Sequence, residues 1–468
     1  MKVTFYGAAR VVTGSKHLLQ INPDKQVLLD CGLFQGMGKD TISLNSHFGF
    51  EPSALYCVIV SHAHIDHVGL LPRLVKEGFS GNIYCTPQTL ELAKLLMTDS
   101  AFIQESDVAH VNKMREKQGR PPEEPLYTVE DAQRVFPHLV PVQMGQHYQI
   151  DDSLDLLYTD AGHILGAAVV NLTIKENGTT KRLAFSGDVG RYGDLILKSP
   201  SAFPQADYII MESTYGNRLH EAVASPTDKL HEFIVDTCIR RRGKLIIPAF
   251  SVGRTQELLF LLNRLELEHR LPDLDYYVDS PLSIETTELI KQHPECFNSD
   301  VRKLMKADPD IFGFKGLQYT NTAADSIALN EVRKPCVIIS ASGMAEAGRV
   351  KHHIAHAIDD ARNTILIVGY CEPHSLGGRL RAGAEEVSIY GAKHTVKAKV
   401  GVIESMSAHA DFNDLCQWLS CQEPKKVRRL ILVHGEYEGQ QEFREKLIRK
   451  GFMDVSIPKL GEEIGLGD

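Results

Sequence analysis

The sequence repeatedly ends a short apolar run with a His or Asp that lies close to a glycine. This pattern occurs four times, at Asp30, His163, Asp188 and His434. Short apolar runs bounded by turn residues predict buried β-strands, and ligands of α/β sheets collect at strand ends. A fold that suits this chain must therefore bring several strand ends, distant in sequence, to one place.

The densest cluster of such residues follows the apolar run "LYCVIVS". Four potential metal ligands occupy six positions there: His62, His64, Asp66 and His67. Alternation in an extended turn would point His62 and His64 the same way, whereas Asp66 and His67 begin a helix and can face elsewhere. Imidazole and carboxylate are zinc ligands. We therefore expect two metal subsites, and the four run ends are the candidates that complete them.

The chain changes character near residue 217 and again towards its end. The first part is rich in predicted strands, with helices predicted over 67–78, 87–118 and 128–136. Beyond it, helical segments alternate with fully apolar strands such as "KLIIPAF", which predicts a parallel sheet covered on both faces. The pattern of the first part then returns. We expect an α/β unit inserted into another, with boundaries at 1–210, 211–392 and 393–468.

Composition limits the classes of protein to consider. Hydrophobic residues make up 43% and charged residues 24%, as in soluble proteins, and no apolar stretch reaches the roughly 18 residues of a membrane span. Nine cysteines without a CxxC pair predict buried, reduced thiols in a cytoplasmic protein. The first residues do not suit a signal peptide. Because the net charge is −9, local cations or a metal would have to hold any polyanion.

These residues resemble the ordered motifs of the metallo-β-lactamase superfamily over almost the whole chain. The insert narrows the resemblance to the nucleic-acid-processing branch called β-CASP: "IIMESTYGNR" with Glu212 is similar to its motif A, "ESMSAHADF" with His409 to motif B, and "VHGE" with His434 to motif C. Segments such as "IPAFSVGRTQELLF" and "ISASGMAEAGRVKHHI" look like those of bacterial and archaeal ribonucleases, relatives of the endonuclease that cleaves pre-mRNA 3′ ends. The resemblance implies an αββα metallo-β-lactamase sandwich with an inserted β-CASP α/β domain, whose parallel sheet is flanked by helices.

The resemblance also implies two Zn2+ per chain. The first zinc would be held by His62, His64 and His163. The second would be held by Asp66, His67 and His434. Asp188 would bridge the two ions, and Asp30 would orient a ligand histidine or the metal-bound water from behind.

Two zinc ions would lower the pKa of a shared water, so that a bridging hydroxide attacks the phosphodiester. The leaving oxygen then benefits from an acid, and the resemblance gives this role to His409. Glu212 would accept a hydrogen bond from His409 and favour its charged form. With Asp66, these are the predicted catalytic residues, although a purely structural or metal-binding role for His409 stays open.

Substrate contacts are predicted on both parts of the chain. Ser407 and Asp411 would cap the helix that begins near 412, whose free amides could hold a phosphate. Ser342 and Gly343 lie in a segment that resembles a family phosphate-binding loop. Basic residues could line a groove between the domains, or simply be solvated: Arg254, Arg349, Lys351, Arg379, Arg381, Lys393, His394 and Lys397.

The leading hypothesis is a zinc-dependent ribonuclease acting on single-stranded RNA, with endonucleolytic processing or decay favoured over 5′–3′ exonuclease activity. RNA is favoured over DNA because His434 matches the histidine that marks RNA-processing members at motif C. The segment "GYCEPHSLGGRL" departs from the usual Gly-Thr stretch, which leaves substrate details open. The alternatives are a small-molecule metallohydrolase of the same superfamily and a non-catalytic scaffold of an RNA-processing complex. A homodimer is compatible with the resemblance, and no membrane contact is expected.

Overall fold

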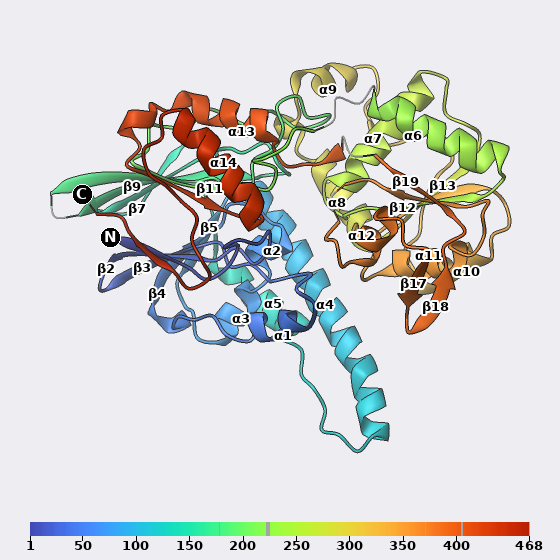
Figure 1. Ribbon diagram of the computed structural model, residues 1–468, viewed down its shortest axis with the longest axis horizontal. Helices are drawn as coiled ribbons and strands as arrows, with labels where there is room; N and C mark the ends of the chain where they lie inside the picture. Colours follow the sequence, from blue (N-terminus) through green and yellow to red (C-terminus); the bar gives the residue numbers. More distant parts are fainter. Residues whose placement is uncertain (177, 221–224, 370, 404–405, 468) are drawn as a thin grey trace. The chain divides into compact units, whose positions relative to one another are not determined.

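The structure, a computed structural model, describes residues 1–176, 178–220, 225–369, 371–403 and 406–467 (Figure 1). Tyr370 and residues 404–405, which belong to segments quoted above, lie outside these ranges. The chain forms two compact units. The first unit comprises Met1–Leu219 and His409–Asp468, and the second comprises His220–Ala408. Among the described residues, no helix has both the length and the hydropathy to cross a bilayer.

The first unit is built on two seven-stranded sheets. The strands of the first sheet lie in the order β22 (Glu463–Gly465), β1 (Lys2–Phe5), β2 (His17–Asn22), β3 (Lys25–Leu29), β4 (Leu55–Ile59), β5 (Asn82–Cys85) and β6 (Leu139–Pro141). Those of the second lie in the order β21 (Val455–Ser456), β20 (Arg429–Val433), β11 (Tyr208–Glu212), β10 (Thr179–Phe185), β9 (Ala168–Glu176), β8 (Leu154–Asp160) and β7 (His147–Asp151). In each sheet one half is antiparallel and the other parallel.

One apolar core joins the two sheets. Strands β1 to β4 and β8 to β11 all contribute fully buried side chains to it, such as Phe5, Ile59 and Val170. The hydroxyl of Tyr158 on β8 crosses this core and donates to the carbonyls of Val60 (3.0 Å) and Tyr84 (2.9 Å). Burial of this apolar surface is the main force that holds the sheets face to face.

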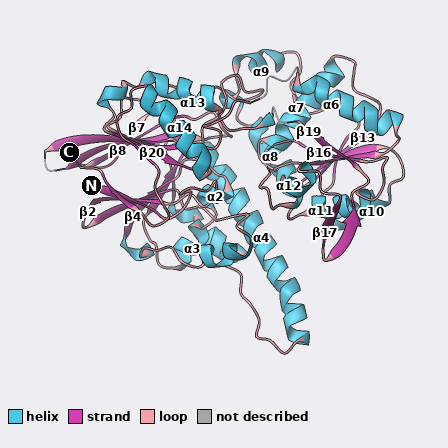
Figure 2. Ribbon diagram, viewed as in Figure 1, coloured by secondary structure: helices cyan, strands magenta, loops and turns pink. Residues whose placement is uncertain are grey.

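Helices cover the outer face of each sheet (Figures 1 and 2). The first sheet is covered by α3 (Leu71–Lys76), α4 (Pro87–Lys117) and α5 (Val129–Arg134), with the short α1 (Thr41–Asn45) near α3. The second sheet is covered by α13 (Phe412–Trp418) and α14 (Tyr437–Arg449). This is the αββα sandwich that the sequence predicts.

The predicted helices over 87–118 and 128–136 correspond to α4 and α5, and local sequence explains where each begins. Thr86 caps α4 by accepting from Thr89 N, with Pro87 in the first turn, and Thr128 with Asp131 forms a capping box at α5. The single helix predicted over 67–78 is wrong. It is two helices, α2 (Ile65–Val68) and α3, because Leu70 N donates to Cys31 O (2.9 Å) and leaves the helical pattern.

The second unit has a six-stranded sheet that is parallel throughout. Its order is β14 (Leu317–Tyr319), β13 (Asp275–Asp279), β15 (Cys336–Ser340), β12 (Lys244–Pro248), β16 (Thr364–Ile367) and β19 (Lys399–Val402). It is accompanied by α6 (Pro226–Ile234), α7 (Arg254–Leu267), α8 (Pro281–Lys291), α9 (Ser299–Leu304), α10 (Ala323–Glu331), α11 (Arg349–Ala357) and α12 (Leu376–Arg381). A separate hairpin consists of β17 (Glu386–Ile389) and β18 (Ala392–Thr395).

Helices on both faces explain why the central strands are apolar throughout. Figure 1 shows α6 and α7 on one face of this sheet and α10 and α11 on the other. Every residue of β15 is buried, as the pattern "CVIIS" predicts for a covered parallel strand. The second unit runs to Ala408, beyond the boundary at 392 expected from the sequence, because β19 pairs with β16.

Most of the cysteines are buried, as predicted, including Cys57 on β4 and Cys336 on β15. Cys421 is an exception, because it is exposed at the end of the short helical turn that follows α13.

Candidate metal centre

The ends of strands from both sheets of the first unit meet at one edge of the sandwich. From the first sheet, Asp30 follows β3, and the His62–His67 segment follows β4. From the second sheet, His163, Asp188 and His434 follow β8, β10 and β20. The last three residues of β3, β4, β10 and β20 are apolar and buried, so the core beneath fixes the polar residues that follow.

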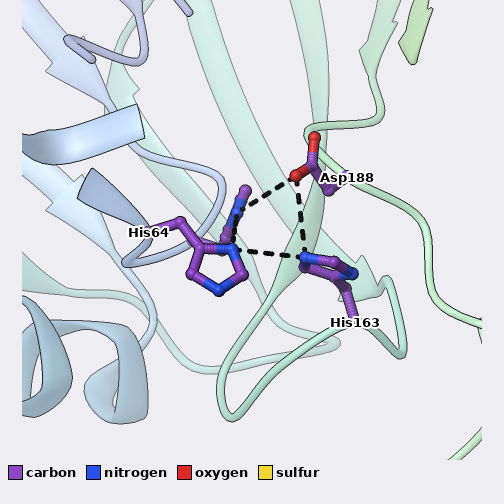
Figure 3. A group of neighbouring side chains, drawn as sticks. His64, His163 and Asp188 are labelled. Atoms are coloured by element: carbon purple, nitrogen blue, oxygen red, sulfur yellow. Dashed lines mark hydrogen bonds and ion pairs between the residues drawn. The ribbon is translucent and has the colours of Figure 1, made fainter. Parts of the chain in front are cut away.

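The first group of converging side chains consists of His62, His64, His163 and Asp188, whose potential ligand atoms all lie within 4.8 Å of one another (Figure 3). His64 Nδ1 lies 3.0 Å from His62 Nε2 and 3.3 Å from His163 Nε2. Asp188 Oδ2 lies 3.5 Å from His62 Nε2 and 3.6 Å from His163 Nε2. The structure thus brings together the residues that the sequence assigns to the first zinc.

The second group consists of Asp66, His67 and His434, also within 4.8 Å. His434 Nε2 lies 3.3 Å from Asp66 Oδ2. The two oxygens of Asp188 face different groups, because Oδ2 lies near the first group and Oδ1 lies 3.4 Å from His67 Nε2. This placement is the one that a bridging carboxylate requires.

Asp30 organises both groups from behind. It is fully buried, and its Oδ2 accepts hydrogen bonds from His67 Nδ1 (2.6 Å) and Ser61 Oγ (2.9 Å). Its Oδ1 accepts from Ser61 N (2.7 Å). Since Ser61 Oγ donates to Asp30, its lone pair is left to accept from His62 Nδ1, which lies 3.0 Å away. Asp30 therefore orients His67 directly and His62 through Ser61, which leaves Nε2 of both rings facing the centre.

The unpaired atoms of the cluster fit a metal. His67 Nε2 and Asp188 Oδ1 are buried, and neither has a hydrogen-bond partner among the described residues. Orphaned buried polar atoms are costly unless a further group satisfies them. Although burial lowers the pKa of His67, the carboxylates of Asp188, Asp66 and Asp30 raise it well above its usual value. The cluster therefore attracts a cation.

Burial has the opposite effect on the other two histidines of the HxHxDH segment. It lowers the pKa of His64 to about 4 and places that of His62 well below its usual value. Both imidazoles are consequently neutral near pH 7, which is the form that binds a metal.

His409 and Glu212 lie together beside the cluster, although 197 positions separate them in the sequence. His409 Nδ1 is 3.2 Å from Glu212 Oε1, and the carboxylate, which is fully buried, also accepts from Val189 N (2.6 Å). Burial opposes the charged form of His409, but Glu212, together with Asp188 and Asp66, outweighs it and raises the pKa of His409 to about 9. His409 can therefore hold a proton at neutral pH, next to the converging ligands.

Asp411 caps α13, as predicted, but the helix amides are not free to bind a phosphate. Asp411 accepts hydrogen bonds from Asn413 N (2.8 Å) and Asp414 N (3.0 Å), so its carboxylate already occupies the helix amides that were expected to bind phosphate. Ser407 lies nearby in sequence and is 7% exposed.

The predicted substrate residues of the second unit differ in their surroundings. Arg254 is buried at the start of α7 and pairs with Glu257, so it does not present a free charge to solvent, contrary to the prediction. Arg349 donates to Asp279 Oδ1 (2.7 Å). Ser342 and Gly343 lie on the loop that follows β15, Arg379 is half-buried on α12, and Lys397 is exposed. Their contact with substrate stays a prediction.

Comparison with known proteins agrees with the fold described above. The family model of the metallo-β-lactamase superfamily matches residues 12–231, that of the Beta-Casp domain matches 255–380, and that of the Zn-dependent metallo-hydrolase RNA specificity domain matches 393–458. The chain is 33% identical to ribonuclease TTHA0252 of Thermus thermophilus, over 99% of this chain and 100% of that protein.

The chain belongs to the β-CASP family of the metallo-β-lactamase superfamily. It is also 30% identical to the transcription termination factor FttA of Methanosarcina mazei and to that of Methanocaldococcus jannaschii, covering 69% and 70% of those proteins and 96% and 98% of this chain. Membership of this β-CASP family makes the chain a metal-dependent hydrolase.

Sequence reasoning missed Ser61. It stands directly before the first histidine of the HxHxDH segment and at the end of β4, but nothing in the sequence indicates that its hydroxyl meets a carboxylate 31 positions away. Only the geometry of the two strand ends reveals this link.

Proposed function

We propose that this β-CASP protein is a zinc-dependent ribonuclease that hydrolyses phosphodiester bonds within single-stranded RNA. The observation that carries the proposal is the placement of Asp188, whose two oxygens face two separate groups of buried ligands. Two Zn2+ held there would lower the pKa of a shared water and neutralise a phosphate oxygen.

Different residues of the chain would bind the metals, orient the ligands and donate the proton. His62, His64 and His163 would hold one ion, and Asp66, His67 and His434 the other, with Asp188 between them. Asp30 and Ser61 fix the ring orientations of His67 and His62, so that the ligand set is formed before a metal arrives. His409 would donate its proton to the leaving oxygen through Nε2, because Nδ1 lies 3.2 Å from Glu212 Oε1.

The identity of the substrate as RNA is supported by the relatives, which include a named ribonuclease, and by the match to an RNA specificity domain. His434, which stands at motif C, agrees with this choice. We place the protein in the cytoplasm, which suits its reduced, mostly buried cysteines. Homodimerisation stays a prediction.

The test is cleavage of single-stranded RNA and matched DNA, each labelled at the 5′ end, by purified protein whose zinc content is measured on the same sample. Internal RNA fragments, about two zinc ions per chain and an inactive Asp66→Ala variant are expected. Single nucleotides released from the 5′ end would instead indicate an exonuclease. A protein that carries two zinc ions and leaves RNA intact would refute the proposal and favour a small-molecule hydrolase.

A further inference from the structure

The turn between β17 and β18 holds an aromatic residue in a conformation that other residues adopt more easily. Ile389 pairs with Ala392, so Tyr390 and Gly391 alone form the turn, with φ values of 51° and 81°. Two successive left-handed residues define a type I′ turn, which prefers Asn-Gly. A left-handed tyrosine is strained relative to asparagine. The needs of the turn therefore do not explain the tyrosine.

The ring of Tyr390 is exposed and packs against a neighbouring ring. It is 58% exposed, and it stacks on the imidazole of His352 with ring centroids 4.6 Å apart and planes 24° apart. His352 is itself exposed on α11. Figure 1 shows the hairpin projecting from the second unit beside α11. The ring of Tyr390 therefore lies at the surface, where it contributes little to the core.

Positive charge flanks this ring. Lys351 Nζ lies over the Tyr390 ring, 5.1 Å from its centroid, and donates to Glu346 O (3.1 Å), which holds the ammonium there. Lys393, which is exposed, follows the turn and pairs with Ser388 across the hairpin. The carboxylate of Glu386 lies at the far end of the hairpin, opposite Thr395. The ring therefore has the Lys351 ammonium over it, and the charged residue closest to the turn along the hairpin is the cation Lys393.

An exposed aromatic ring accompanied by lysines matches the chemistry of single-stranded nucleic acid, in which each base offers a flat face and each phosphate a negative charge. We propose that Tyr390, supported by His352, stacks on a base of single-stranded RNA while Lys351 and Lys393 contact the adjacent phosphates. This inference rests on the proposed function, because it takes RNA as the substrate.

Tyr390→Asn separates stacking from folding, since asparagine suits the turn better and removes only the ring. Binding of a labelled single-stranded RNA is measured in the full-length, zinc-loaded His409→Ala background, which keeps the metal ligands. We expect Tyr390→Asn to weaken binding roughly tenfold with no loss of thermal stability, and Tyr390→Phe to retain affinity. Tyr148→Asn is the matched control, because Tyr148 on β7 is also an exposed tyrosine (37%) packed on a ring, that of Tyr84.

Salt dependence distinguishes stacking from charge. Lys351→Gln should reduce the slope of log Kd against log salt by about 0.7, whereas Tyr390→Asn should leave that slope unchanged. If Tyr390→Asn binds RNA as tightly as the parent, or Tyr148→Asn loses as much, the inference is overturned while RNA cleavage by the wild type still supports the proposed function. If no variant binds RNA and the wild type does not cleave it, both are overturned together.

Discussion

Ser61 offers a selective way to disturb one half of the candidate metal centre. Its hydroxyl lies between Asp30 Oδ2 (2.9 Å) and His62 Nδ1 (3.0 Å), and it is 1% exposed. Ser61→Ala removes the hydroxyl that links Asp30 to His62. The direct contact of Asp30 with His67 remains, and so does the bond from Ser61 N, because the backbone is unchanged.

The expected effect follows from these contacts. Loss of a partner behind a ligand histidine lowers metal affinity by about 10- to 100-fold, or about 1.4–2.7 kcal/mol. His62 belongs to the first group of ligands and His67 to the second. Ser61→Ala should therefore weaken one of the two zinc affinities by this factor and change the other little. Asp30→Ala should weaken both.

The assay is stepwise zinc binding against a chromophoric chelator, with the unfolding midpoint of each variant measured alongside. Ser340→Ala is the matched control, because Ser340 is also a buried serine at a strand end whose hydroxyl donates, to the backbone carbonyl of Asp279 (2.8 Å), but in the second unit. Ser340→Ala should keep both zinc affinities. If Ser61→Ala binds both zinc ions as tightly as the wild type, or loses affinity for both equally, then Ser61 does not act selectively through His62.

Three further predictions concern activity and stability. His409→Ala should lower kcat by about 10²- to 10⁴-fold with full zinc content; intact kcat would rule out the proton-donor role. Burial lowers the pKa of His409, but Glu212 raises it to about 9. Activity should therefore fall as pH rises through that value. Glu212→Gln should move this fall to lower pH in a pH–rate profile. Tyr158→Phe should lower the free energy of unfolding by about 1–3 kcal/mol in denaturant titrations, because two buried carbonyls lose their shared donor; an unchanged value would contradict this.

The sequence predicts which candidate ligands meet, because each lies close to a strand end. Buried strands have a clear apolar pattern, and His163, Asp188 and His434 stand within three positions of the ends of theirs. The core between the sheets then fixes where these ends meet. In this region, periodicity and ligand chemistry lead to one arrangement.

The sequence fails where a side chain has a choice of partner. Arg254 looks like a surface cation, but an acid one helical turn later, Glu257, neutralises it. Asp411 caps its helix as predicted, but in doing so it satisfies the amides that were expected to hold a phosphate. Each outcome depends on distances of a few ångström between groups, which a linear pattern does not encode.

The contacts at the two ends of the insertion also position the proposed proton donor of the first unit. The chain leaves the first unit after Leu219 and returns at His409, so the two ends of the insertion must lie close together. A bridge between Tyr215 and Asp411 and a hydrogen bond from Phe412 N to Arg218 O (3.1 Å) hold them there. The same junction carries Glu212 on one side and His409 on the other. The contacts that close the insertion are therefore also those that place the proposed proton donor beside the ligands, so a variant that loosens the junction should lose proton donation before it loses zinc.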